Sequence, residues 1–177
     1  MSLREKYMAK ETRLADLESF DLDKDQWLRL CGKSSSDAKV DAVVHNGAAV
    51  NWVASCSDLH KTNIDSAVQL LKIAIESTAF PKYVYISGGL KKRASETLEE
   101  FAAKLLSWAG YFQTKFVAES VIREIASRLP AVQNRISVVK PGLIIGTAAS
   151  GAANTDDVLW RAVATAVGIG LTLLSIK

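Results

Sequence analysis

Short apolar runs recur along the chain, and each is closed by residues that favour turns. The three clearest runs are Val40–His45, Tyr83–Ser87 and Ile136–Val139. Runs of this length that end near glycine, asparagine or proline are typical of strands buried in a parallel sheet. The stretch Arg13–Glu18 is predicted to form a further short strand.

The segments between these runs carry apolar residues at the spacing of one helix face. From about Ser57 to Ser77, for example, Val68, Leu71 and Ile75 lie on one side of a helix. The predicted helices are Lys24–Cys31 (ended by Gly32), Ser57–Ser77, Glu96–Trp108, Tyr111–Arg128, and a last helix from a cap at Asn154-Thr155-Asp156-Asp157 to about Val167.

Strands that alternate with helices at this spacing indicate an α/β fold built from βαβ units. Such a fold has a mostly parallel sheet with helices on both faces. Its chemistry lies beyond the carboxyl ends of the strands. Asn46, Ser87 and Pro141 follow three of the predicted strands closely, so this edge of the sheet is the predicted site.

Composition narrows the class of protein. With 177 residues and 49% hydrophobic content, we expect one domain over residues 1–177, of which residues 1–12 would be flexible or tag-derived. A net charge of +3 without a basic block argues against a nucleic-acid partner. Cys31 and Cys56 lack metal-binding spacing, so we expect no metal and a reducing, cytoplasmic setting. Neither a secretory signal nor a membrane span of roughly 20 apolar residues is expected.

Tyr111 and Lys115 are candidate proton-handling residues. They are four positions apart in a predicted helix and therefore share a face. A phenol ordinarily ionises near about pH 10, and a nearby ammonium lowers that pKa. Such a pair can donate a proton to a carbonyl oxygen as hydride arrives at the carbonyl carbon. The spacing alone is a weak motif, because ordinary exposed helix pairs also have it.

The order of these motifs along the chain resembles the extended short-chain dehydrogenase/reductase superfamily. More narrowly, VDAVVHNGAAVNW, the helix around Asn63, GYFQTKFVAE and KPGLIIGTAASGAANTDD resemble the thioester reductase domains of nonribosomal peptide synthetases and carboxylic acid reductases. The resemblance covers nearly all of residues 13–168. It implies a Rossmann-like, doubly wound sheet. It also implies reduction by NADPH of an acyl or peptidyl thioester, held on a carrier protein's phosphopantetheine, to an aldehyde or sometimes an alcohol.

The resemblance also assigns roles to residues at matching positions. Tyr111 would donate the proton, and Lys115 would hold the nicotinamide ribose and poise Tyr111. The other residues expected at the cofactor are Asp16, Asn46, Gly47, Ala48, Asn63, Pro141 and Gly142. The residues expected at the acyl or pantetheine path are Gly88, Gly89, Thr147 and Asn154, the last two within the segment 147–157.

One departure from the family concerns the third catalytic group. The family usually has Thr or Ser directly after the serine that ends the middle strand, and this chain has Gly88 there. Ser87 could serve instead if Gly88-Gly89 lets the backbone turn its hydroxyl inward. Alternatively, Ser87 only caps the strand end, and the carbonyl is polarised less well.

A second departure is that no glycine-rich phosphate-binding turn precedes Asp16. By resemblance, the chain begins near the third strand of the family's sheet and stops before the substrate-binding subdomain is complete. Strand Val40–His45 would then have a bare edge, covered either by Arg13–Glu18 or by a second molecule. We therefore expect the isolated chain to form oligomers or to be unstable.

Several alternatives remain open at this stage. The fold could serve a relative that releases carrier-bound chains without redox chemistry, such as a Dieckmann-type cyclase, or a pseudoenzyme. It could be a module that only docks a carrier protein. A nucleotide-sugar epimerase or dehydratase is a further alternative, although the segment 154–157 favours the reductases.

Three further features have simpler explanations than catalysis. Cys56 and His60, four apart, could pair as nucleophile and base, but no third orienting group is evident. His45 is expected to pack beside Asn46. Trp52 either walls the pocket or is a buried loop aromatic.

Overall fold

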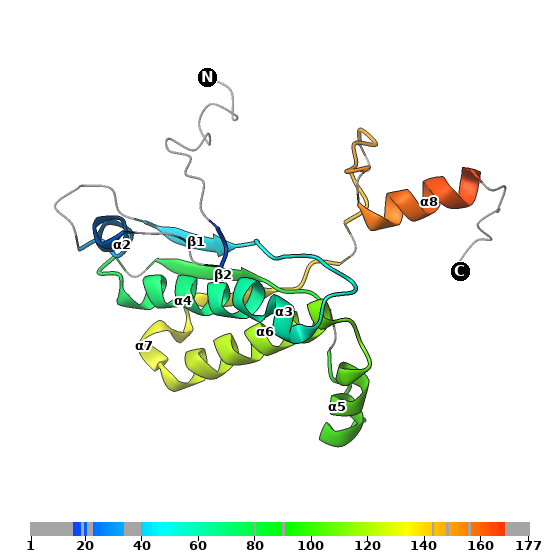
Figure 1. Ribbon diagram of the computed structural model, residues 1–177. Coiled ribbons are helices and arrows are strands. Elements are labelled where there is room, and N and C mark those ends of the chain that lie inside the picture. The colour runs from blue at the N-terminus through cyan, green and yellow to red at the C-terminus, as the bar shows by residue number, and fades with distance from the viewer. Residues whose placement is uncertain are drawn as a thin grey trace. The chain divides into compact units, whose positions relative to one another are not determined.

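The computed structural model describes residues 16–18, 20, 23–33, 40–79, 81–89, 91–142, 144–147, 149–155 and 157–168. The chain forms two compact units, residues 1–140 and 141–177. The first unit contains α2 (Lys24–Leu30), β1 (Ala42–His45), α3 (Cys56–His60), the π-helical turn η1 (Lys61–Asp65), α4 (Ser66–Glu76), β2 (Lys82–Ile86), α5 (Leu98–Leu106), α6 (Gly110–Arg128), α7 (Pro130–Gln133) and β3 (Ile136–Val139) (Figure 1). The second contains α8 (Val158–Gly168).

The three described strands form one parallel sheet in the order β1-β2-β3. Tyr83 of β2 is in register with Val43 and Ile136, and Tyr85 is in register with His45 and Val138. The three apolar runs predicted as parallel strands are therefore confirmed. Within the part of the chain that the structure describes, β1 lies at a sheet edge, as the resemblance implied.

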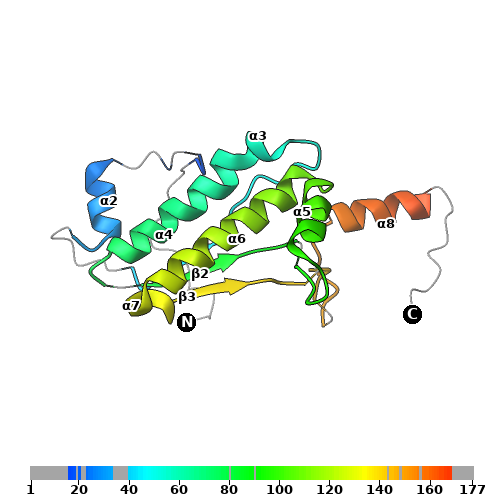
Figure 2. The same ribbon diagram turned by 90° about the horizontal axis from the view of Figure 1, so that it is seen from below.

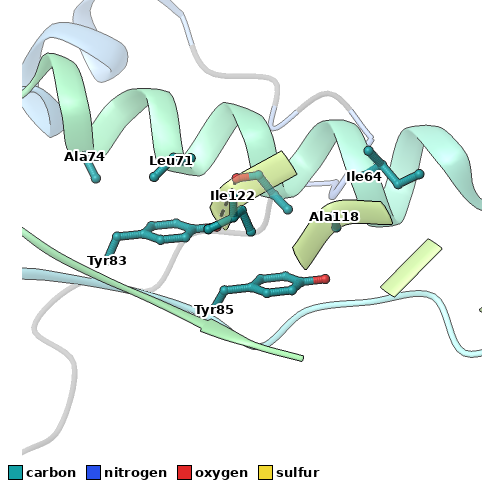
Figure 3. Close-up of a cluster of buried hydrophobic side chains, with 8 residues drawn as sticks. Ile64, Leu71, Ala74, Tyr83, Tyr85, Ala118 and Ile122 are labelled. Carbon is teal, nitrogen blue, oxygen red and sulfur yellow. Dashed lines mark hydrogen bonds between the residues drawn. The ribbon is translucent and has the colours of Figure 1, made fainter. Parts of the chain in front are cut away.

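Helices α4 and α6 run side by side across one face of this sheet (Figure 2). The rings of Tyr83 and Tyr85 fill the space between sheet and helices (Figure 3). They pack with Ile64, Ala67, Leu71, Ala74, Ala118 and Ile122. Tyr83 also donates its hydroxyl hydrogen bond to the Ala67 carbonyl at 2.9 Å. This cluster is the core that fixes α6 over the strands.

The opposite face of the sheet carries apolar side chains as well, because strand residues alternate between faces. Its members are Ala42, Val44, Val84, Ile86 and Val139. Val44 is 62% exposed. Helices α4 and α6 cover the other face, as a doubly wound sheet requires on each of its faces. They are the described helices that pack on the sheet.

Local side-chain hydrogen bonds explain where three of the described helices start. Asp23 with Gln26, Ser55 with Asp58, and Thr97 with Glu100 form capping boxes at the beginnings of α2, α3 and α5. Gly32, at a φ of 64°, follows α2 and ends it as predicted. The cap at Thr97 explains why α5 begins at Leu98 rather than at the predicted Glu96.

Two predictions about elements were wrong. Asp16–Glu18 is not a strand but part of a turn, in which Phe20 N–H donates to the Asp16 carbonyl at 2.7 Å. The Asp16 carboxylate also accepts from Glu18 N–H at 2.9 Å, so this side chain satisfies the turn locally. Residues 1–12 and 13–15 lie outside the described residues.

The predicted helix from Ser57 to Ser77 is not continuous either. It begins at Cys56 and is interrupted by η1, where the backbone widens into a π-helical turn. The short helix α7 was not predicted, although Pro130 at its first turn is a typical start signal.

Candidate active site

Lys115 reaches the carboxyl end of β2 from the middle of α6. Its side chain is buried, with 4% exposed. Its ammonium donates to the carbonyl of Ile86, the last residue of β2, at 2.7 Å. It also lies 4.5 Å from the centroid of the Tyr85 ring. Burial lowers the pKa of Lys115 to about 8, and the Glu119 carboxylate opposes this change.

Tyr111 lies one turn before Lys115, at the start of α6. Its ring is half-buried and meets the ring of Trp52, in the loop after β1, at a centroid distance of 6.1 Å. Burial raises the pKa of Tyr111. We expected Lys115 to lower this pKa, and that expectation is wrong here, because burial of the phenol acts in the opposite direction and raises it.

The position of Tyr111 depends on Gly110. A Cβ at Gly110 would lie 2.4 Å from the backbone nitrogen of Cys56, so only glycine allows α6 to start against the beginning of α3. This contact holds Tyr111 beside the loop between β1 and α3.

Asn63, in the π-helical turn, ties that loop to α6. Its side-chain oxygen accepts from Ala49 N–H at 2.7 Å, and its amide donates to the Ala49 carbonyl and to Thr114 Oγ1, each at 3.1 Å. Thr114 in turn donates to the Tyr111 carbonyl at 2.8 Å. Asn63 therefore positions the loop, and Thr114, which the sequence interpretation missed, completes the link.

The turn after β1 also meets the first described segment. A Cβ on Gly47 would lie 2.9 Å from the Leu17 side chain, so Leu17 packs directly on this glycine. Leu17 follows Asp16 directly, so the segment that carries Asp16 lies against the turn that contains Asn46 and Ala48.

Ser87 faces a buried carboxylate. Its hydroxyl donates to Glu119 Oε2 at 2.7 Å, and its backbone N–H donates to the Val139 carbonyl at 2.8 Å. This geometry favours the alternative in which Ser87 caps the strand end. The adjacent Gly88 has open space around it, and Gly89, at a φ of 95°, lies against Phe112.

Glu119 is a second residue that the sequence interpretation missed. It also accepts from Arg123 Nε at 2.9 Å and pairs with Lys140 Nζ at 2.8 Å. Burial raises the pKa of Glu119, but hydrogen bonds from Lys140, Ser87 and Arg123 outweigh burial and lower it overall. The available signal was spacing, since Tyr111, Lys115 and Glu119 repeat every four positions along α6.

The remaining predicted site residues belong to the unit 141–177. Pro141 and Gly142 are exposed and follow β3. Thr147 N–H donates to the Ala152 carbonyl at 2.9 Å, which closes a small loop before Asn154. The cap predicted for α8 is described only in part, because Asp156 lies outside the described residues.

The Cys56–His60 pair does not have the features of an activated thiol. Burial raises the pKa of the Cys56 thiol, whereas an activated thiol has a lowered one. His60 Nδ1 instead faces Asp65 at 3.5 Å.

Among the described residues, no group of three or more His, Cys, Asp or Glu side chains could hold a metal ion. No described helix has the length and apolar character needed to cross a bilayer.

The described residues fit one end of a dinucleotide. An ammonium and a phenol lie at the carboxyl edge of the sheet, near open backbone at Gly88, which suits a nicotinamide and its ribose. No described helix begins with the glycine-rich turn that usually receives a pyrophosphate. The fold and this edge define a Rossmann-like domain of the reductase class.

Known proteins narrow the class further. A model of the NAD-binding family described as "Male sterility protein" matches residues 15–175. N-benzoylphenylalaninol synthetase apmA of Penicillium brevicompactum is 41% identical over 136 residues, which are 77% of this chain and 6% of that protein. Nonribosomal peptide synthetase atnA of Emericella nidulans is 46% identical over 137 residues, 76% of this chain and 2% of that protein.

A solved structure agrees with the sequence comparisons. The terminal R domain from the myxalamid PKS-NRPS biosynthetic pathway superposes with a TM-score of 0.70 at 27% identity, over 90% of this chain and 40% of that one. The chain therefore belongs to this NAD-binding family and, within it, to the thioester reductase domains of nonribosomal peptide synthetases. It spans only a small part of the synthetases that it matches.

Proposed function

We propose that this chain takes part in NADPH-dependent reductive release of an acyl or peptidyl thioester from the phosphopantetheine of a carrier protein. The observation that carries the proposal is Lys115 at the carboxyl end of β2, one helical turn after Tyr111. This is the edge where α/β folds of this class bind ligands.

The chemistry assigns one proton to Tyr111. NADPH, when bound, supplies the hydride that the thioester carbonyl carbon accepts. Tyr111 gives its proton to the carbonyl oxygen, and this proton leaves with the carrier thiol when the carbon–sulfur bond breaks. Because burial raises the pKa of Tyr111, the phenol is protonated at neutral pH and can act as the donor. Lys115, with a pKa of about 8, is mostly charged there, and its role in this proposal is to hold the nicotinamide ribose through its ammonium.

An aldehyde is the product of one such reduction, and a second reduction would give an alcohol. The name of the relative from Penicillium brevicompactum, N-benzoylphenylalaninol synthetase, is that of an alcohol-forming protein. This supports reductive release in the family. It leaves aldehyde and alcohol as outcomes to be measured for this chain.

The decisive experiment separates cofactor binding from turnover. The purified chain is titrated with NADPH and with NADH by fluorescence, then given an acyl-phosphopantetheine thioester while NADPH oxidation is followed. Tyr111→Phe should abolish turnover and leave NADPH affinity nearly unchanged, whereas Lys115→Met should weaken both. Absence of NADPH binding would reject autonomous catalysis, and full turnover by Tyr111→Phe would remove Tyr111 from its role.

A second candidate is a module that docks a carrier protein, or releases its cargo by cyclisation, without a redox step. One observation favours it: Ser87 donates to Glu119 and so is held away from a catalytic role. Carrier binding or cyclised product in the absence of any nicotinamide would support this candidate over the first.

A further inference from the structure

An exposed row of aromatic rings lies directly beside Tyr111. Trp52 meets Phe112 at a centroid distance of 5.1 Å, and Phe112 meets Trp108 at 4.9 Å. Trp52 also meets the Tyr111 ring at 6.1 Å. Trp52 is 48% exposed and Trp108 is 40% exposed. We call Trp52, Phe112 and Trp108 the aromatic wall.

The wall is held in place by its surroundings. Asn51 Oδ1 accepts from Val53 N–H at 3.0 Å and from Ala54 N–H at 3.1 Å, which fixes the loop that carries Trp52. On the other side, the amide of Gln113 donates to the Trp108 carbonyl at 2.8 Å. The rings are therefore preorganised, although none belongs to the hydrophobic core.

We propose that the aromatic wall is the subsite for the acyl group, and that it selects thioesters with an aromatic or large apolar side chain next to the carbonyl. The inference rests on the proposed function of Tyr111. A proton donor must come within about 3 Å of the carbonyl oxygen. A side chain near that carbonyl then falls within reach of the ring that touches Tyr111.

The chemistry of the wall supports this occupant over a polar one. Trp52, Phe112 and Trp108 carry no charge, and the neighbouring Val50 and Val53 are exposed and apolar. Aromatic pairs gain from edge-to-face contacts in addition to area burial. The contacts of Phe112 with both tryptophans have this geometry, at interplanar angles of 65° and 81°.

The test compares thioesters that differ only in the acyl side chain. Phenylalanyl, leucyl, alanyl and aspartyl phosphopantetheine thioesters are titrated into the full chain, with binding measured by calorimetry and turnover by NADPH oxidation. Phenylalanyl thioester should bind about tenfold or more tightly than alanyl thioester, a difference typical of apolar pockets. Trp52→Ala should remove most of this preference, and Trp52→Phe should restore much of it. Val44→Ala, an exposed valine on the opposite sheet face, is the matched control and should change nothing.

The outcomes separate this inference from the proposed function. Selective binding without NADPH oxidation would keep the subsite and reject the redox step. Equal binding of phenylalanyl and alanyl thioesters would overturn the subsite, whatever the turnover. A dimer that dissociates on Trp52→Ala, with no acyl preference, would overturn it by showing that the wall pairs with a second copy. If Trp52→Ala fails to fold, the wild-type panel and Trp52→Phe decide.

Discussion

Replacing Asn63 tests whether the loop after β1 is positioned by a buried amide. Asn63 is 1% exposed and makes three hydrogen bonds, two to Ala49 and one to Thr114. Asn63→Ala removes all three hydrogen bonds, so the N–H and carbonyl groups of Ala49 must hydrogen-bond to water instead. π-helical turns such as η1 commonly occur at functional sites.

The size of the effect follows from these contacts. A net contribution of about 1 kcal/mol for each hydrogen bond predicts a loss of about 3 kcal/mol in the free energy of unfolding. Ala49 is only partly buried, so water can reduce this to about 2 kcal/mol. The matched control is Asn51→Ala, because Asn51 also accepts from two backbone N–H groups but is exposed. Its loss should stay below about 1 kcal/mol.

Urea unfolding followed by circular dichroism gives both free energies, and hydrogen exchange reports the Ala49 amide directly. In Asn63→Ala, the Ala49 amide should exchange faster while the core amides of β2 keep their relative protection. The reasoning fails if Asn63→Ala costs no more than Asn51→Ala, or if Ala49 exchange is unchanged.

Three further predictions follow from buried or exposed groups of the sheet. Tyr83→Phe should lower the free energy of unfolding by about 1 kcal/mol, because the Tyr83 hydroxyl donates to the Ala67 carbonyl in α4. Tyr85→Phe should leave it unchanged, because the buried Tyr85 hydroxyl has no hydrogen-bond partner among the described residues. Equal losses for the two variants in urea unfolding would contradict this. Burial, aided by Lys115, lowers the pKa of His45 from 6.5 to about 4, so about 3 kcal/mol of stability present above pH 6.5 should be lost as the pH falls toward 4. In His45→Gln, the free energy of unfolding should depend much less on pH across this range. An unaltered pH dependence would exclude His45 as the cause of the loss. Val44→Lys should raise the monomer fraction in light scattering with little change in stability, and a wild-type chain that is already a clean monomer would refute self-association through the sheet.

The sequence was sufficient where local pattern decides the structure. The strand residues are mostly apolar on both faces of the sheet, so the runs that became β1, β2 and β3 could be identified with their order. The prediction of a strand at Asp16–Glu18 failed because an alternation of polar and apolar residues also suits a turn. There a carboxylate bonds to the backbone two residues on, and no longer-range pattern distinguishes the two.

The sequence predicted that Lys115 would lie at the carboxyl edge of the sheet, but it could not give the contacts there. Lys115 meets the end of β2 because α6 packs on a sheet whose parallel strands place their carboxyl ends at one edge. The partner of Lys115 is a backbone carbonyl, which every residue possesses, so residue type could not reveal it. The Ser87–Glu119 hydrogen bond joins residues 32 positions apart, and only the tertiary packing of α6 on the sheet brings them together.

These contacts give α6 a defined register across the edge of the sheet. Tyr111 meets the loop after β1 through Trp52, and Lys115 meets the end of β2. Glu119 meets the residue after β3 through Lys140. The three side chains are spaced one helical turn apart, so a rotation of α6 by one residue, about 100°, would break every link at once. The same register brings the buried ammonium of Lys115 and the phenol of Tyr111 to one edge. We therefore expect variants of Glu119 to change the pH dependence of any activity that uses Lys115, even though Glu119 touches neither substrate nor cofactor in the proposed chemistry.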